Sequence, residues 1–165
     1  MSPIILPRKW MLHAHGKRNV FVKGSQERAE HVLMKIFLWA LYLPQYPDLE
    51  VETRIGDRYK PDVVQLGAPL FDGTREPEFW GESEQVSVKK IESLARRYRH
   101  THFAIAKWDH NLKPYVAIVE QATNGLDRTA PFDLIRFPAD SADRFIDREG
   151  NVTVTFADVE WVRVE

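Results

Sequence analysis

The spacing of hydrophobic residues predicts two strands at the start of the chain, followed by a long helix. Residues 9–24 contain two runs rich in β-branched and aromatic residues that meet near Gly16, the pattern of two strands and a turn. Ser25 is a helix-capping residue type, and the apolar residues that follow fit a helix as far as Leu43. Pro44 ends this helix. Because its second half is apolar on all sides, we expect it to be buried at the centre of the protein.

Alternating and continuous apolar runs predict further strands and helices in the rest of the chain. A hairpin is expected in residues 49–66, with its turn at Gly56 and Asp57. Ser87 is the expected cap of a second helix. The other predicted elements follow in order: a strand at 78–84, a helix at 87–99, a strand at 102–108, a helix at 114–122, and strands at 132–137, 151–156 and 159–165.

The order of these elements predicts a mixed central β-sheet flanked by helices, an α/β (α+β) fold. The strand at 78–84, the helix after it and the strand at 102–108 have the form of a βαβ unit, so these two strands should be parallel. No repeat, low-complexity stretch or long linker divides residues 1–165. We therefore expect a single domain, the usual number for a chain of this length.

Composition narrows the class of protein without identifying a function. Of the 165 residues 44% are hydrophobic and 28% are charged, which is typical of a soluble globular protein. The absence of cysteine excludes disulfides and thiolate-based metal or redox chemistry. The longest apolar run, residues 36–43, is far shorter than the roughly 20 residues that span a membrane. No signal peptide is evident, and we expect a cytoplasmic protein without a membrane partner.

The charges are unevenly distributed along the chain. A net charge of −1 argues against a strongly basic, dedicated nucleic-acid binder. However, residues 1–24 carry five Lys and Arg and no acid, and residues 85–107 carry six against one acid. These segments form either one positive surface or two separate solvated faces. If nucleic acid is a partner, Lys90, Arg96 and Arg97 are the candidate contacts to its phosphates.

Carboxylates in or beside predicted strands are the leading candidates for chemistry. Asp62 lies in a run that is otherwise apolar, where an unpaired buried acid is costly. Glu82 shares a strand face with Trp80, because side chains alternate along a strand. If the strands at 60–66 and 78–84 are neighbours, the two carboxylates converge. Oxygen ligands of this kind suit Mg²⁺ or Mn²⁺.

A glutamate and a lysine are further candidates for the same site. Glu30 falls on the helical stripe of Leu33 and Phe37, so we expect it to point inward and to support the metal. Lys89 lies in the first turn of the helix at 87–99, where the helix dipole disfavours a cation. A lysine beside a metal site can orient the attacking water or stabilise charge on a phosphate. The alternative for each residue is an ordinary structural role.

Two His-X-His pairs contain a residue type that binds metals, but they are weaker candidates for a metal site than the carboxylates. His13 and His15 flank the predicted turn at Gly16 and are expected at the surface. His100 and His102 end the basic helix, where solvated or dipole-stabilised cations are expected. Contact of the second pair with phosphates is the functional alternative.

The ordered set of carboxylates resembles a known family. A helix glutamate, Pro-Asp in a strand, and an acidic strand followed by lysine resemble the PD-(D/E)XK nuclease-like superfamily, whose fold is restriction endonuclease-like. The closer resemblance is to the YaeQ-like proteins, a bacterial group with that fold. It is carried by ERAEHVLMKIFLWAL, YKPDVVQL, FWGESEQVSVKKI and the strands after Asp147, and covers most of the chain. The resemblance implies that Asp62 and Glu82 bind a metal and that Glu30 completes the site.

The motif lysine is where this chain departs from the superfamily pattern. The motif places a lysine two residues after the acidic residue, a position held here by Glu84. In YaeQ-like proteins the lysine comes from the following helix, which Lys89 matches, with Lys90 as the alternative. The resemblance implies a Mg²⁺-dependent or Mn²⁺-dependent nuclease that hydrolyses phosphodiester bonds in DNA or RNA. The alternative is a non-catalytic module that keeps the fold and binds nucleic acid or protein.

Overall fold

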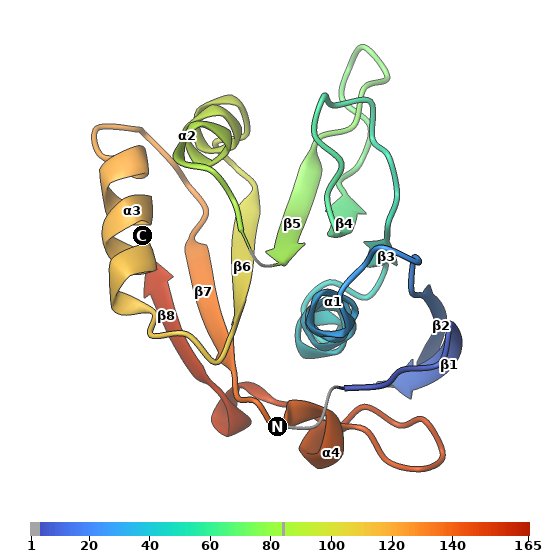
Figure 1. The fold of residues 1–165 in the computed structure, drawn as a ribbon. Helices are drawn as coiled ribbons and strands as arrows, with labels where there is room; N and C mark the ends of the chain where they lie inside the picture. The colour runs from blue at the N-terminus through green and yellow to red at the C-terminus, as the bar shows by residue number, and fades with distance from the viewer. Residues whose placement is uncertain (1–3, 84) are drawn as a thin grey trace.

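A six-stranded mixed sheet forms the centre of the computed structural model, which describes residues 4–83 and 85–165 (Figure 1). The strand order is β3-β4-β5-β6-β7-β8. These strands are β3 (Glu50–Val51), β4 (Val63–Leu66), β5 (Pro77–Ser83), β6 (His102–Trp108), β7 (Phe132–Phe137) and β8 (Glu160–Val164). The predicted α/β fold with a mixed sheet between helices is confirmed.

Strand pairing confirms the predicted βαβ unit. Strands β5 and β6 are parallel, with Phe79 opposite His102, and β6 and β7 are also parallel. Helices α2 (Val88–Arg97) and α3 (Lys113–Thr123) make the two crossovers and pack against each other on one face of the sheet (Figure 1). The pairs β3–β4, β4–β5 and β7–β8 are antiparallel.

The opposite face of the sheet is covered by α1 (Ala29–Tyr42), with the hairpin of β1 (Lys9–Ala14) and β2 (Lys17–Val22) beyond it (Figure 1). Almost every residue of α1 is buried, as its apolar pattern predicts. Gly81 on β5 permits a close approach, because a Cβ there would lie 3.3 Å from Leu38 Cδ1. The second half of α1 therefore packs closely against β5.

The start of α1 differs from the prediction. Ser25 was expected to cap the helix, but helical geometry begins at Ala29, and Arg28 occupies the cap position without a side-chain hydrogen bond. A turn precedes it, in which Gly24 N–H donates to Glu27 Oε1 at 3.1 Å. This hydrogen bond closes the turn before α1, and the other carboxylate oxygen of Glu27 contacts His31 and Lys35 on the helix.

The prediction of a strand at 151–156 was wrong, although the residues it expected to be buried include two that are buried, Val152 and Val154. Asn151 and Val152 form only isolated bridges, with His13 and Ile146. Residues 153–155 are irregular and are followed by a 3₁₀ turn at 156–158. Val152 and Val154 are buried against the main core, so the alternation reflects burial beneath the hairpin rather than a strand ladder. The short helix α4 (Ser141–Phe145) was not predicted.

A buried polar network joins α1 to the last strands. Asp133 on β7 is completely buried and accepts hydrogen bonds from Tyr42 Oη at 2.7 Å and from Arg163 Nε at 2.8 Å. His102 Nε2 lies 2.6 Å from the same carboxylate, and His102 Nδ1 lies 2.9 Å from Tyr46 Oη. Burial opposes the charge of Asp133, but hydrogen bonds from His102 and Arg163 lower its pKa overall. His102 is thus a core residue, and its prediction as a surface cation was wrong.

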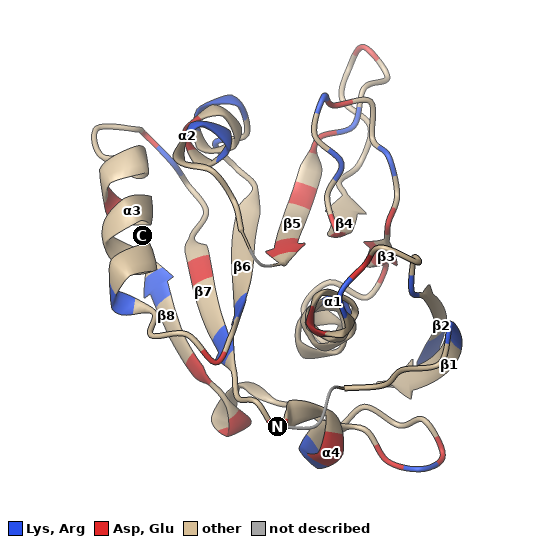
Figure 2. Ribbon diagram, viewed as in Figure 1, with Lys and Arg blue, Asp and Glu red and all other residues tan. Residues whose placement is uncertain are grey.

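The two basic segments of the sequence do not form one surface. The basic residues Lys9, Lys17 and Arg18 lie on the β1–β2 hairpin, whereas most of those in 85–107 lie on α2, on the other side of α1 and the sheet (Figure 2). Of the two predictions left open by the sequence, separate faces is therefore the correct one. Within the described residues, the structure contains no helix with the length and hydrophobicity that a membrane span requires.

Candidate functional site

The candidate carboxylates lie where β4 begins and the parallel strand β5 ends. Val63 pairs with Gly81 in the antiparallel register, which places Asp62 across from the end of β5. Asp62 N–H donates to Gly81 O at 3.1 Å, and Asp62 Oδ2 accepts from Ser83 N–H at 2.8 Å. These backbone hydrogen bonds fix the aspartate at the carboxyl edge of the sheet. Ligands of open α/β folds commonly bind outside this edge.

Glu82 is the buried member of the pair. It lies on the same face of β5 as Trp80 and is only 7% exposed. Its Oε1 accepts hydrogen bonds from Trp80 Nε1 and Lys90 Nζ, both at 2.8 Å. Burial and the nearby charge of Asp62 raise the pKa of Glu82 to about 6, although Lys90 and Trp80 act in the opposite direction. A buried glutamate whose ionisation a neighbouring carboxylate opposes is a candidate for a functional site.

The lysine that contacts Glu82 is Lys90. Ser87 caps α2 as predicted, accepting from Lys90 N–H at 3.1 Å, and this cap sets the first turn of the helix. Lys90 then points at Glu82 while its ammonium lies 5.0 Å from the centroid of the Tyr59 ring. Lys89 is exposed. Of the two lysines considered for the motif, the structure therefore brings Lys90 to the carboxylates.

His31, rather than Glu30, connects α1 to the carboxylates. The Glu30 side chain is 23% exposed and pairs with Arg28 Nε at 3.5 Å, so its position differs from the expected inward one. His31 Nε2 lies 3.4 Å from Asp62 Oδ2, and His31 Nδ1 lies 2.6 Å from Glu27 Oε2. The hydrogen bond to Asp62, supported by Glu27, raises the pKa of His31 despite burial. The contact with Asp62 thus favours the protonated form of His31.

A chain of alternating charges continues from His31 along α1. Lys35 is almost completely buried, and its ammonium lies 2.5 Å from Glu27 Oε2 and also binds Glu52 Oε1. Lys60 contacts the other oxygen of Glu52 at 2.5 Å. Burial alone would lower the pKa of Lys35, but the hydrogen bonds to the two glutamates raise it. This network fixes Glu27, and through Glu27 it orients His31 towards Asp62.

The other predicted contacts lie away from the carboxylates or outside the described residues. Arg97 binds Asp57 of the β3–β4 loop and donates to Ser93 Oγ at 3.1 Å. Arg96 is exposed on α2. Glu84, which holds the motif lysine position, lies outside the described residues. Within the described residues, no group of three or more His, Cys, Asp or Glu side chains is arranged to hold a metal. Of the three carboxylates predicted to bind a metal, Asp62 and Glu82 are the two that lie near each other.

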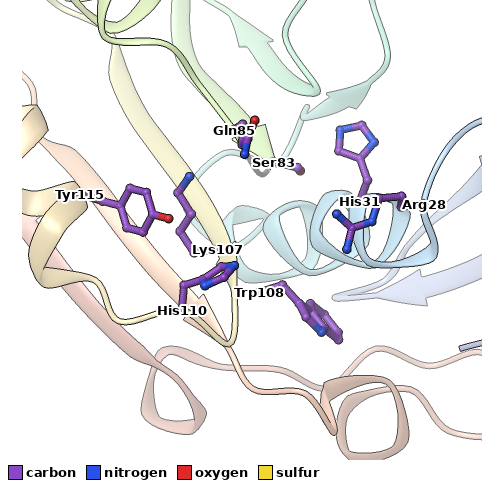
Figure 3. Close-up of a pocket in the computed structure, with 8 residues that line it drawn as sticks. All are labelled: Arg28, His31, Ser83, Gln85, Lys107, Trp108, His110 and Tyr115. Atoms are coloured by element: carbon purple, nitrogen blue, oxygen red, sulfur yellow. The ribbon is translucent and has the colours of Figure 1, made fainter. Parts of the chain in front are cut away.

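A cationic pocket of about 470 Å³ opens beside this pair (Figure 3). His31 and Arg28 line it from the start of α1, and Lys107 and Tyr115 line it from the opposite side, on β6 and α3. Ser83 lies between them at the end of β5. The remaining lining residues are Gln85, Trp108 and His110. Because His31 contacts Asp62 and also lines the pocket, the carboxylates lie at its margin.

Sequence analysis missed His31, Ser83 and Lys107. Lys107 had a usable signal, since it is a lysine inside the apolar run of residues 102–108 and is 5% exposed in the structure. No signal in the sequence marked Ser83 or His31, because their positions depend on the approach of β5 to the start of α1. The exposed pair His13 and His15 lines a separate open pocket beside the turn of the β1–β2 hairpin.

Comparisons with known proteins identify the fold. No protein-family model matches the sequence, and no curated protein is detectably similar to it. The structure is similar to the YaeQ protein from Pseudomonas syringae, with a TM-score of 0.56 and 14% identity over 89% of this chain and 80% of that one. It is also similar to the YaeQ protein from Xanthomonas axonopodis pv. citri, with a TM-score of 0.52 and 13% identity over 78% and 72% of the two chains. The protein therefore has a YaeQ-like fold.

Proposed function

We propose that the protein is a magnesium-dependent phosphodiesterase that acts on nucleic acid, as its resemblance to the PD-(D/E)XK superfamily implies. The observation that carries this proposal is the pairing of Asp62 with the buried Glu82 beside a cationic pocket. The ionised form of the buried Glu82 beside Asp62 is unfavourable unless a cation is supplied. The adjoining pocket offers positive charge to the substrate phosphate.

The donor set suits Mg²⁺ or Mn²⁺ better than a softer metal. Mg²⁺ usually takes one or two protein carboxylates and completes its shell with water and substrate oxygens, so the pair Asp62 and Glu82 is sufficient. Structural zinc sites, by contrast, use four cysteine or histidine ligands. When bound, a magnesium ion polarises the phosphate and lowers the pKa of water.

The chain's own residues supply charge and position around the carboxylates. Lys90 donates to Glu82 and so favours the ionised carboxylate that a metal requires. His31 holds Asp62 in place from α1. Arg28 and Lys107 line the pocket, where their positive charges attract a phosphate group.

One observation favours the alternative of a non-catalytic module. Lys90 already forms an ion pair with Glu82, and Trp80 donates to the same oxygen, so the carboxylate is partly compensated without a metal. In that case the pocket beside it would bind nucleic acid without cutting it. The two functions are distinguished by whether the protein cleaves the nucleic acid that it binds.

A cleavage assay tests the proposed function. The wild-type protein is expected to cleave DNA or RNA in the presence of Mg²⁺ or Mn²⁺. Cleavage should stop when EDTA removes the metal. Asp62→Asn should reduce the rate by at least about 100-fold, since even residues that only orient metal ligands change activity by roughly 10–100-fold. Glu92→Gln, an exposed residue of α2, is the control and should retain the wild-type rate.

The assay uses single-stranded and double-stranded forms of both polymers, so that no substrate class is missed. Metal-dependent cleavage that survives Asp62→Asn would contradict the proposal, because the activity would then belong to another site or to a contaminant. Binding of a polymer with no cleavage in either metal would establish the non-catalytic alternative.

A further inference from the structure

The loop between β4 and β5 presents two apolar side chains to solvent. Leu70 is 50% exposed and Phe71 is fully exposed, and the residues of 68–76 around them are exposed as well. The loop projects beyond the ends of the two strands at the top of Figure 1. A large aromatic side chain in full contact with water gains free energy when a partner covers it, and aromatic residues are common anchors of protein interfaces. We call Leu70 and Phe71 the loop tip.

The loop tip is held in one conformation by hydrogen bonds within the loop. Leu70 N–H donates to Thr74 O at 2.6 Å, and Gly73 N–H donates to Leu70 O at 2.8 Å. Asp72 Oδ1 accepts from the N–H of Thr74 at 3.0 Å and from its hydroxyl at 2.6 Å. A turn that is fixed before association loses little conformational entropy on binding, so the loop tip is a pre-organised anchor.

The outer face of the β1–β2 hairpin is a second apolar surface exposed to solvent. Directly opposite residues of antiparallel strands share a face of the sheet. The apolar residues on this face are 40–53% exposed, and cations flank them at both ends. We call the three exposed pairs on this side the hairpin face: Lys9–Val22, Met11–Val20 and His13–Arg18.

A hollow of about 580 Å³ adjoins the hairpin face at Val22. It has the size of a small-ligand pocket, roughly 300–1,000 Å³, so a phenylalanine side chain fits inside it. Its wall combines apolar side chains of the segment before β1 with two cations, and the residues besides Val22, Gly24 and Ser25 are Ile4, Ile5, Leu6, Arg8 and Lys23. Apolar walls with a basic rim suit an aromatic group whose neighbours are acidic.

The loop tip and the hairpin face lie in segments of opposite charge. Residues 1–24 contain five Lys and Arg and no acid, whereas residues 68–78 contain three acids and one arginine. The acids are Asp72, Glu76 and Glu78. They disfavour a nucleic acid or an anionic lipid at the loop tip, because like charges repel. A basic surface with an apolar centre matches the loop tip, and the hairpin face has that character.

We infer that the chain forms a two-fold dimer in which Phe71 of each copy enters the hollow beside Val22 of the other copy. In Figure 1 the loop and the β1–β2 hairpin lie at opposite ends of one side of the molecule. A two-fold axis between these ends places each loop tip against the hairpin of the other copy, so the same contact forms twice. The inference is independent of the proposed function, because neither surface includes Asp62 or Glu82.

Sedimentation equilibrium of the purified protein tests this dimer, at concentrations between about 1 μM and 1 mM, the range in which weak to moderate complexes form. The average mass is expected to rise with concentration and to level off at twice the mass of one chain. The mass of a single chain at every concentration would overturn the inference. Growth beyond two copies would overturn the closed two-fold arrangement.

Three variants locate the contact. Phe71→Asp should raise the dissociation constant of the dimer at least about 100-fold, because it removes an anchor from both copies of the contact. Val22→Asp, which places an acid in the hollow, should have the same effect. Val88→Asp, at a 44% exposed apolar residue of α2, is the control and should dimerise like the wild type. Urea unfolding shows that each variant is folded.

A mixture of the two defective variants identifies which surfaces pair. Each variant alone loses both contacts, whereas a dimer of Phe71→Asp with Val22→Asp keeps one contact, between an intact loop tip and an intact hollow. The mixture should therefore dimerise at concentrations at which neither variant does so alone. No dimer in the mixture, or wild-type dimerisation of Val22→Asp, would overturn the pairing of the loop tip with the hairpin face.

An anionic membrane is the competing occupant of the basic hairpin face, and co-sedimentation with vesicles of phosphatidylserine and phosphatidylcholine tests it. We expect Val22→Asp and the wild type to remain equally in solution, because the hairpin face binds a second copy of the chain. Wild-type protein that stays monomeric and binds the vesicles, with binding lost in Val22→Asp, would overturn the dimer.

Discussion

Lys90→Met is expected to reduce metal-dependent cleavage by about 100-fold or more at neutral pH, the usual contribution of a group that assists proton transfer or charge stabilisation. Lys90 donates to the buried Glu82 at 2.8 Å. Burial and Asp62 already raise the pKa of Glu82 to about 6, and Lys90 is the strongest influence that lowers it. Without the lysine, we expect the pKa to rise further, so that more of the carboxyl group is protonated and unable to bind a metal.

Lys89→Met is the matched control, because it removes the same charge from the neighbouring position. Lys89 is exposed in the first turn of α2, so its loss should leave the rate within about twofold of wild type. The rates are measured with the substrate that the wild-type protein cleaves best, after urea unfolding has shown that both variants are folded. A large loss in Lys89→Met together with full activity in Lys90→Met would contradict the assignment of the motif lysine.

Asp133→Asn is expected to lower the free energy of unfolding by roughly 3–5 kcal/mol, the usual cost of breaking a buried ion pair by removing one partner. Asp133 is completely buried and accepts hydrogen bonds from Tyr42 and Arg163, with His102 at 2.6 Å. The asparagine amide replaces an acceptor by a donor, so one of these groups loses its partner. The network joins α1 to β6, β7 and β8, and the whole fold should therefore be affected.

Urea unfolding near neutral pH measures the effect, with Asp109→Asn as the control. Asp109 is partly exposed and pairs with Arg136 at 2.6 Å, so its loss should cost less than about 1 kcal/mol. The pKa of Asp133 is lowered in the folded protein, so its stabilising effect is present above its ordinary value of 3.8 and is lost as the pH falls through the folded value. An equal loss in the two variants would contradict a special role for the buried carboxylate.

The arrangement of the strands was predictable because each boundary has a strong local cause. Apolar runs and turn residues mark β4, β5 and β6, and Ser87 caps α2 in the structure as in the prediction. The position of Asp62 across from the end of β5 follows from the hairpin register once those strands are neighbours. The prediction was wrong at residues 151–156, because the alternation of buried and exposed residues there arises from packing beneath the β1–β2 hairpin and not from pairing with a neighbouring strand.

The candidate site was only partly predictable, because much of it depends on contacts between distant segments. Helical spacing placed Glu30 on the inward stripe, yet its neighbour His31 reaches Asp62, since Glu27 and Lys35 orient the imidazole. The choice between the two lysines after β5 depends on the angle at which α2 leaves the sheet. One residue of helix corresponds to about 100° of rotation, and the sequence does not determine this angle to that accuracy.

Calorimetric titration with Mn²⁺ tests the central claim, that Asp62 and Glu82 hold a divalent cation, most directly. At about pH 8 Glu82 is ionised, because its pKa is about 6. We predict saturable binding by the wild-type protein and by Glu92→Gln, weakened at least tenfold in Asp62→Asn and in Glu82→Gln. Binding should also weaken at about pH 5, where Glu82 takes up a proton. No saturable binding by the wild type, or equal binding by all four proteins, would contradict the account.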